Sequence, residues 1–354
     1  MQNKTSNKNK YSLGKLAGTN PASVCYALEK QGIAPLNIKN ILMREYALGE
    51  GAADMLLALL DNQKFVVRNN KHISLDLTFP ENEPGHVQDI YVNSLIEELK
   101  TARKLITAKS FLVEAVRINK GAMLLPGKSL RALLTECGFS GAEISIDTGN
   151  YKLLTQEKLD ILCACRVNWI GFDINSFNAG TKGGTDLNSF LKIYKQCLNP
   201  GLKLHLNFKK GMGSEVWQDF ANSLAYLAEF MPHSVSIGTY ARQKYTDART
   251  QELVRVMWRT HEFLTEKAYK PYTIYAEKTN PQVLNMSYCQ AKEQNKFNVF
   301  ANKGQSTIIG CGVGAKTMLP DGLSGEVKVY QNTADLSEYV FDINGVLRKK
   351  NEFF

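Results

Sequence analysis

A chain of 354 residues, 44% of them hydrophobic, is long enough to bury a sizeable core as one large domain with additions or as two domains. Its formal net charge of +9 favours anionic partners, but it is too dilute over such a surface to indicate nucleic-acid binding, which we do not expect. The longest apolar run, Met55 to Leu60, is far too short for a membrane span, so no membrane partner is expected either.

The seven cysteines are scattered and odd in number, which fits a reduced intracellular protein better than a disulfide scaffold. The N-terminus is polar and has no apolar signal core. We therefore expect a cytoplasmic protein.

In chain order, residues 1–69 form an N-terminal region with a polar, mobile tail and helical patterns such as LNIKNILMREYAL. Residues 70–270 then alternate between strand-like runs and helical patterns. The strand-like runs are ISLDLTF, FLVEAVRI, AEISID, NWIGFDI, LKLHLNF and SVSIGTY. Six βα units predict a parallel sheet, because each helical crossover returns the chain to the same direction.

From about Tyr272 the alternation stops, and residues 271–354 are predicted to be a C-terminal extension. Its strand candidates are TIYAE, FNVFAN, STIIGC and EVKVY, and one final helix is predicted over TADLSEYVFDINGVLRKK. The predicted class is α/β, and in such sheets the functional groups gather at the carboxyl ends of the strands.

Several segments carry a resemblance to a known family. The stretch AEISIDTGNYKLLTQEKLDILCACRVNWIGFDINSFN resembles the central part of oxygen-independent coproporphyrinogen III oxidases, which are radical-SAM enzymes. PYTIYAEKTN, LNMSYC and STIIGCGVGAKTM are similar to C-terminal elements of that family, and LGKLAGTNPASV and LRKKNEFF look closest to its Firmicute-type coproporphyrinogen dehydrogenase branch. The resemblance implies a partial (β/α)6 TIM-like radical-SAM barrel with an N-terminal helical region and a C-terminal α+β extension, and a link to haem biosynthesis.

The resemblance also shows what is missing after the first strand. There the family has three cysteines, spaced C-x3-C-x2-C, whose thiolates hold a [4Fe-4S] cluster while SAM binds the fourth iron. Counted from Phe79, the matching positions are Pro80, Pro84 and Val87, none of which can ligate iron. We therefore predict that the cluster is absent.

The other side chains that could ligate iron are poor substitutes for those thiolates. Glu81, Glu83 and His86 occupy the same turn, but they are hard or borderline donors, and we do not predict a metal site there. Cys311, in the glycine loop, is the one cysteine retained as a candidate ligand or reactive thiol.

The resemblance implies a degenerate SAM site, so SAM binding is doubtful. After the second strand the turn NKGAML has one glycine where the family has a glycine-rich turn, and on the fifth strand Lys209 replaces an aspartate that helps hold the nucleoside. The positions that match the family's cofactor site are Gly121, Asp147, Asn175, Gly312 and Gly314.

Basic side chains near the fifth and sixth strand ends predict a mouth that suits a carboxylate-bearing ligand such as a tetrapyrrole. The predicted mouth residues are Lys209, Lys210, Tyr240, Arg242 and Lys244. Simpler interpretations stay open: Asp147 could belong to a structural ion pair, GCGVGA is favoured as a tight turn over a dinucleotide site, and His205 is expected in the barrel wall.

Three functions remain. The first, which we favour, is a non-catalytic homologue that binds a tetrapyrrole or another anionic small molecule. The second is an enzyme with altered cofactor use, although no nucleophile with its base, metal-spaced cluster or phosphate loop replaces what was lost. The third is a regulatory protein partner of an active paralogue.

Overall fold

The computed structural model describes residues 39–40, 71–80, 85–177, 184–198, 200–210, 217–239, 259–276, 284–291, 293–303, 306–320 and 327–354. Within these residues, eleven strands form one sheet in the order β11-β10-β9-β1-β2-β3-β4-β5-β6-β8-β7. The strands are β1 (His72–Leu77), β2 (Leu112–Ile118), β3 (Glu143–Gly149), β4 (Trp169–Ile174), β5 (Lys203–Lys210), β6 (Ser234–Thr239), β7 (Lys270–Ala276), β8 (Leu284–Cys289), β9 (Thr307–Cys311), β10 (Lys316–Pro320) and β11 (Val327–Gln331).

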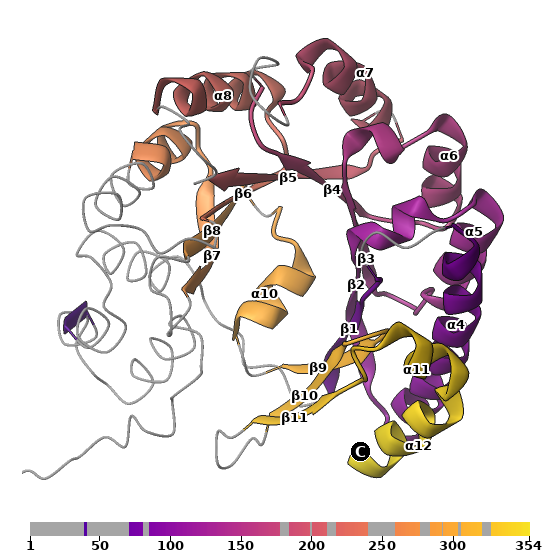
Figure 1. Ribbon diagram of the computed structural model, residues 1–354. Coiled ribbons are helices and arrows are strands. Elements are labelled where there is room, and N and C mark those ends of the chain that lie inside the picture. The colour runs from indigo at the N-terminus through magenta and orange to yellow at the C-terminus, as the bar shows by residue number, and fades with distance from the viewer. Residues whose placement is uncertain are drawn as a thin grey trace, which may run out of the picture.

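The six predicted strands are confirmed as β1 to β6, and each pairs in parallel with the next. The helices between them are α4 (Gly85–Ala108), α5 (Gly127–Glu136), α6 (Gln156–Ala164), α7 (Leu187–Leu198) and α8 (Trp217–Phe230), with short 3-10 turns η2 (Lys120–Leu124) and η3 (Tyr151–Leu153). Figure 1 shows these helices outside the curved sheet, as right-handed βα crossovers require. No helix in the described part of the chain is long and apolar enough to cross a membrane.

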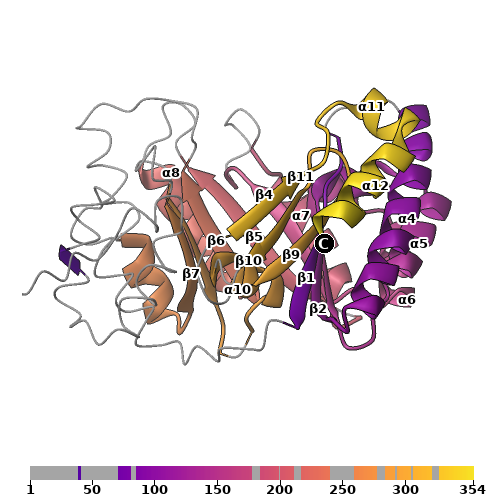
Figure 2. The same cartoon turned by 90° about the horizontal axis from the view of Figure 1, so that it is seen from below.

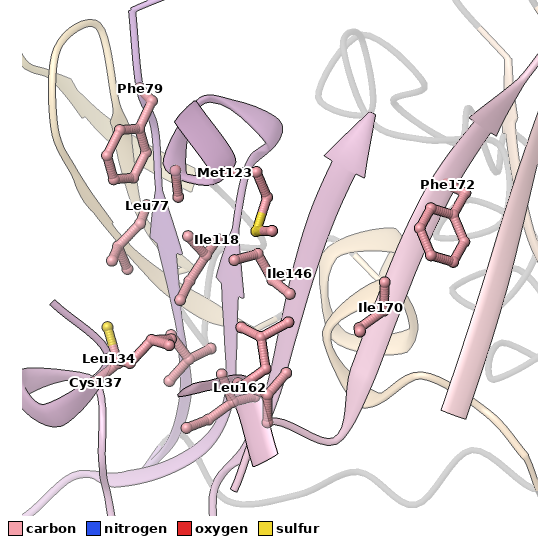
Figure 3. Packing of buried hydrophobic residues seen from close by; sticks show 14 of the residues in the cluster. Leu77, Phe79, Ile118, Met123, Leu134, Cys137, Ile146, Leu162, Ile170 and Phe172 are labelled. Carbon is pink, nitrogen blue, oxygen red and sulfur yellow. The ribbon is translucent and has the colours of Figure 1, made fainter. Parts of the chain in front are cut away.

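The main core lies between the sheet and these outer helices. Strand residues such as Ile118 and Ile146 point toward Leu134 of α5 and Leu162 of α6 (Figure 3), and all four are buried. Successive side chains of a strand alternate between faces, so one apolar face on each strand is enough to anchor the helix layer.

The C-terminal segments continue the same sheet. β9 pairs in parallel with β1 on the side away from β2, while β8 pairs antiparallel with β6. Figure 2 shows β9, β10 and β11 beside β1. The chain therefore returns to the first strand of the barrel after passing the last one.

One predicted strand is wrong. FNVFAN is part of a helix, α10 (Lys296–Lys303), which lies inside the curve of the sheet (Figure 1). Asn295 Oδ1 accepts a hydrogen bond from the Asn298 backbone N–H at 3.0 Å and caps the helix start. Phe297 and Phe300, three residues apart, share one helix face and pack against Ala115 of β2.

The single helix predicted at the C-terminus is in fact two, α11 (Leu336–Phe341) and α12 (Ile343–Phe353). Asp342 separates them, because its side chain accepts a hydrogen bond from the Gly345 N–H at 3.1 Å and so caps a new helix start. Both helices contact α4 on the outer side of the sheet (Figure 2).

A buried ion pair ties α12 to α4. Glu98 of α4 and Lys350 of α12 are both fully buried and bonded to each other. Glu98 also accepts hydrogen bonds from the Gly312 N–H at 2.7 Å, from Asn332 Nδ2 at 2.8 Å and from the Tyr339 hydroxyl at 2.5 Å. A buried carboxylate with several donors is stable only while its partners remain, so the C-terminus and the loop after β9 depend on this cluster.

We expect Lys350→Met to lower the free energy of unfolding by roughly 3–5 kcal/mol, because it leaves the Glu98 carboxylate buried without its counter-charge. The matched control is Lys349→Met, which changes an exposed neighbour on the same helix and should alter stability by less than about 0.5 kcal/mol. Urea denaturation followed by circular dichroism measures both. Equal losses in the two variants would contradict the role given to the pair.

Candidate functional site

The end of β1 is where the family would place its cluster. Pro80 is the last described residue of this segment, and the preceding Phe79 is buried against Tyr91. Pro84 lies outside the described residues, and Val87 lies in α4 with its side chain outside them. Of the three positions, the structure therefore places Pro80 after β1 and the Val87 backbone in α4.

Two of the predicted cofactor glycines meet at this same strand end. A Cβ at Gly121, in η2, would collide with the Phe79 side chain, and a Cβ at Gly312 would collide with the Thr78 carbonyl. Gly312 also has φ +108°, a conformation that favours glycine. Both glycines are thus required by close packing around β1.

The loop GCGVGA is a tight turn whose backbone is used internally. The N–H groups of Gly312, Val313 and Gly314 donate to Glu98, to the Tyr91 hydroxyl and to the Thr333 carbonyl, at 2.7, 3.1 and 2.7 Å. A phosphate-binding loop needs such N–H groups directed at the ligand. The interpretation as a tight turn is therefore favoured over a dinucleotide site.

The described cysteines are poorly placed to act as thiolates. Cys311 is fully buried beneath this loop, with its Sγ 3.6 Å from Lys350 Nζ, and burial raises the pKa of its thiol to about 12. Burial likewise raises the pKa of Cys197 and of Cys289 to about 12. In the described part of the chain, no group of three or more His, Cys, Asp or Glu side chains could hold a metal ion.

A polar cavity of about 360 Å³ lies inside the curve of the sheet, beside α10. Its walls come from the inward faces of β2 to β8 and from α10. The lining residues are Arg117, Ser145, Asp147, Trp169, Gly171, His205, Asn207, Ser236, Thr273, Asn285, Ser287, Asn295, Asn298 and Ala301. We call this space the lumen cavity.

Asp147 is the one predicted cofactor residue that lines the lumen cavity. It lies beside Gly171 of β4, and a Cβ at Gly171 would collide with its carboxylate. Nearby, Arg117 donates to Asp76 from Nε at 2.9 Å and from Nη2 at 2.7 Å, and its guanidinium lies 4.3 Å over the Phe297 ring of α10. This wall of the lumen cavity therefore holds the Arg117 guanidinium, which is paired with Asp76, and the Asp147 carboxylate close to it.

His205, predicted in the barrel wall, is confirmed there. Its Nδ1 lies 2.9 Å from the Ser234 hydroxyl, and its Nε2 lies 2.8 Å from Asn207 Oδ1 and 3.0 Å from the Ser236 hydroxyl. Burial lowers its pKa to about 4. Both ring nitrogens are partnered and the imidazole is neutral at pH 7, so it suits hydrogen bonding better than proton transfer.

Three of the remaining predicted residues lie at strand ends. Asn175 directly follows β4. Lys209 and Lys210 end β5, paired with Gly238 and Thr239 of β6, and their side chains are outside the described residues. Tyr240, Arg242 and Lys244 lie outside the described residues altogether.

Comparison with known proteins agrees with this architecture. No protein-family model matches the sequence. Among solved structures the chain is similar to HemN of Escherichia coli, described as a coproporphyrinogen III oxidase that is a radical SAM enzyme. The TM-score is 0.61 at 17% identity, and the match covers 86% of this chain and 74% of HemN. The protein therefore shares the TIM-like α/β fold of HemN.

The chain is also similar to a curated protein. The chain is 23% identical over 213 residues to HemZ of Bacillus subtilis strain 168, an oxygen-independent coproporphyrinogen-III oxidase-like protein. That match covers 56% of this chain and 42% of HemZ, so it spans less than half of the relative's length. The sequence comparison and the fold comparison therefore both find similarity to proteins described as coproporphyrinogen III oxidases or as like them.

The lumen cavity itself was missed by sequence reasoning. The signal was present: residues 143–147 of β3 and 234–237 of β6 alternate between apolar residues, such as Ile146 and Ile237, and polar ones, such as Ser145 and Ser236. A parallel strand buried on both faces usually reads as a continuous apolar run. Alternation within a parallel sheet could therefore have indicated a polar interior.

We expect His205 to make stability depend on pH. Its pKa is about 4 in the folded chain against 6.5 ordinarily, so as pH falls from 6.5 the unfolded chain binds the proton first. The stabilisation is fully present above about pH 6.5 and is lost as pH falls toward 4, by on the order of 3 kcal/mol. The test is urea unfolding across this range for the wild type and His205→Gln. Parallel stability curves for the two proteins would refute this role.

Proposed function

We propose that this protein is a non-catalytic homologue of the oxygen-independent coproporphyrinogen III oxidases. In this proposal it binds a tetrapyrrole or another anionic small molecule at the strand-end mouth and does not cleave SAM reductively. The observation that carries the proposal is the replacement of all three cluster cysteines, by Pro80, Pro84 and Val87, in a chain that keeps the barrel. A [4Fe-4S] cluster requires a face of soft thiolates, and carbon side chains supply none.

Two further features support the loss of cofactor chemistry. Lys209 stands where the resemblance implies a carboxylate for the nucleoside, and a lysine ammonium cannot accept a hydrogen bond from ribose hydroxyls. The backbone N–H groups of the glycine loop are already bonded within the chain. Neither feature favours a tightly held SAM.

The register of the sheet supports an anionic ligand. Lys209 and Lys210 pair with the last two residues of β6, so the ends of β5 and β6 are neighbours. The segment with Arg242 and Lys244 follows β6 directly in the sequence. Carboxylate groups such as those of a coproporphyrin are natural partners for clustered Arg and Lys side chains.

We expect anaerobic reconstitution with iron and sulfide to give no stoichiometric cluster in the wild-type protein and no 5′-deoxyadenosine from SAM under reducing conditions. The readouts are iron and sulfide content, the visible spectrum and chromatography of SAM products.

The matched variant is Pro80→Cys, Pro84→Cys and Val87→Cys together. If these positions are the old ligand set, the triple variant should gain iron where the wild type has none. A wild-type protein with a full cluster and SAM cleavage would overturn the non-catalytic proposal and favour an enzyme with other ligands.

For the ligand, we expect coproporphyrin III to bind saturably, as followed by its fluorescence. The double variant Arg242→Ala and Lys244→Ala should weaken binding by about tenfold or more, because it removes charge-assisted contacts to carboxylates. The control double variant, Arg348→Ala and Lys349→Ala, removes the same charge from exposed positions on α12. An equal loss in both would mean that net charge alone, and not the mouth, attracts the porphyrin.

A further inference from the structure

The lumen cavity has a different chemistry from the basic mouth. Most of its lining side chains are uncharged groups that both donate and accept hydrogen bonds. These are Ser145, Thr273, Ser236, Ser287, Asn207, Asn285, Asn295, Asn298 and His205. They come from strands β3 and β5 to β8 and from α10 and its start, so a molecule in the cavity would meet polar groups from the sheet and from the helix.

The charged side chains in and beside the lumen cavity interact with one another. The Arg117 fork faces Asp76 through two hydrogen bonds, and Asp147 lies within electrostatic reach of the same guanidinium. An anion entering the cavity would meet a guanidinium already neutralised by carboxylates. A charge buried without a partner is costly, so this wall disfavours the anionic ligands that suit the mouth.

The wall also holds a donor without an acceptor. Trp169 is 1% exposed, and its indole Nε1 has no hydrogen-bond partner among the described residues. Buried indole N–H groups usually find a partner. The Trp169 ring itself is fixed, with Lys203 Nζ 5.4 Å over it and the His233 ring edge-on at 6.2 Å.

Helix α10 lines one side of the space and is fastened to the barrel by polar contacts. The Lys296 N–H donates to Glu143 Oε1 at 2.7 Å, Lys296 Nζ lies 3.3 Å from Glu114, and Asn298 Nδ2 donates to the Tyr272 hydroxyl at 3.2 Å. The cavity therefore lies between the sheet and a helix that is held in place by these contacts.

We propose that the lumen cavity binds a small uncharged molecule that carries hydroxyl or amide groups. The volume of about 360 Å³ lies within the range of small-molecule sites, which is roughly 300–1,000 Å³. Gly171 allows the Asp147 carboxylate to lie against β4 in this wall, because a Cβ there would collide with it. The site differs from the mouth in the charge of its lining side chains, so this proposal does not depend on the anion-binding function.

The test uses three planar probes of the same shape and different charge: acetamide, acetate and acetamidinium. Binding is followed by the ¹⁵N–¹H signal of the Trp169 indole, assigned by its loss in Trp169→Phe. We expect acetamide to shift this signal saturably, and the two ions, at matched ionic strength, to bind at least about tenfold more weakly because each brings an unpartnered charge.

A filling variant checks that the shift arises in the cavity. Ala301→Leu places a larger side chain on the cavity face of α10 and should abolish the shift. Ala164→Leu, at an exposed helical position on α6, should leave it unchanged. Tighter binding of acetate or acetamidinium, no saturable shift with any probe, or an acetamide shift that survives Ala301→Leu would overturn the proposal.

Discussion

The two-residue period of the strands is the constraint on which the rest of this structure depends. Along β5, Leu204, Leu206 and Phe208 are buried, and the residues between them include His205 and Asn207, which line the lumen cavity. The apolar face anchors the outer helices, because it has nowhere else to be buried. The polar face is then forced inward, where hydrogen-bonding groups need partners.

The C-terminal part of the chain supplies those partners. Helix α10 enters the curve of the sheet and brings asparagines and Lys296 to the polar face, while its Phe297 and Phe300 cover the small Ala115. Farther along, β9 pairs with β1 and the Glu98–Lys350 pair fixes the loop that follows it. The barrel is thus completed by segments distant in sequence, which makes its interior a product of the whole described fold.

The contrast between the local strand pattern and the partners supplied by distant segments explains which parts of the structure the sequence could predict. The six parallel strands and the helices between them follow from local alternation and periodicity, and His205 was placed in the wall by the same pattern. FNVFAN was misassigned because six residues fit both a short strand and fewer than two turns of an amphipathic helix, and the Asn295 cap and packing on Ala115 decide between them. The lumen cavity needs side chains from seven strands and a helix to be placed together, which no local pattern records.

The polar interior also bears on what the barrel accommodates. Buried polar groups add little stability over well-packed apolar ones, and an incompletely satisfied set is worse than an apolar core. Here His205 is fully partnered, yet the Trp169 N–H and the Ser74 hydroxyl have no partner in the described residues. Folding alone would be served better by apolar side chains in that space. A polar cavity lined by side chains from seven strands and from α10 is therefore better explained by a molecule that it accommodates than by the stability of the barrel.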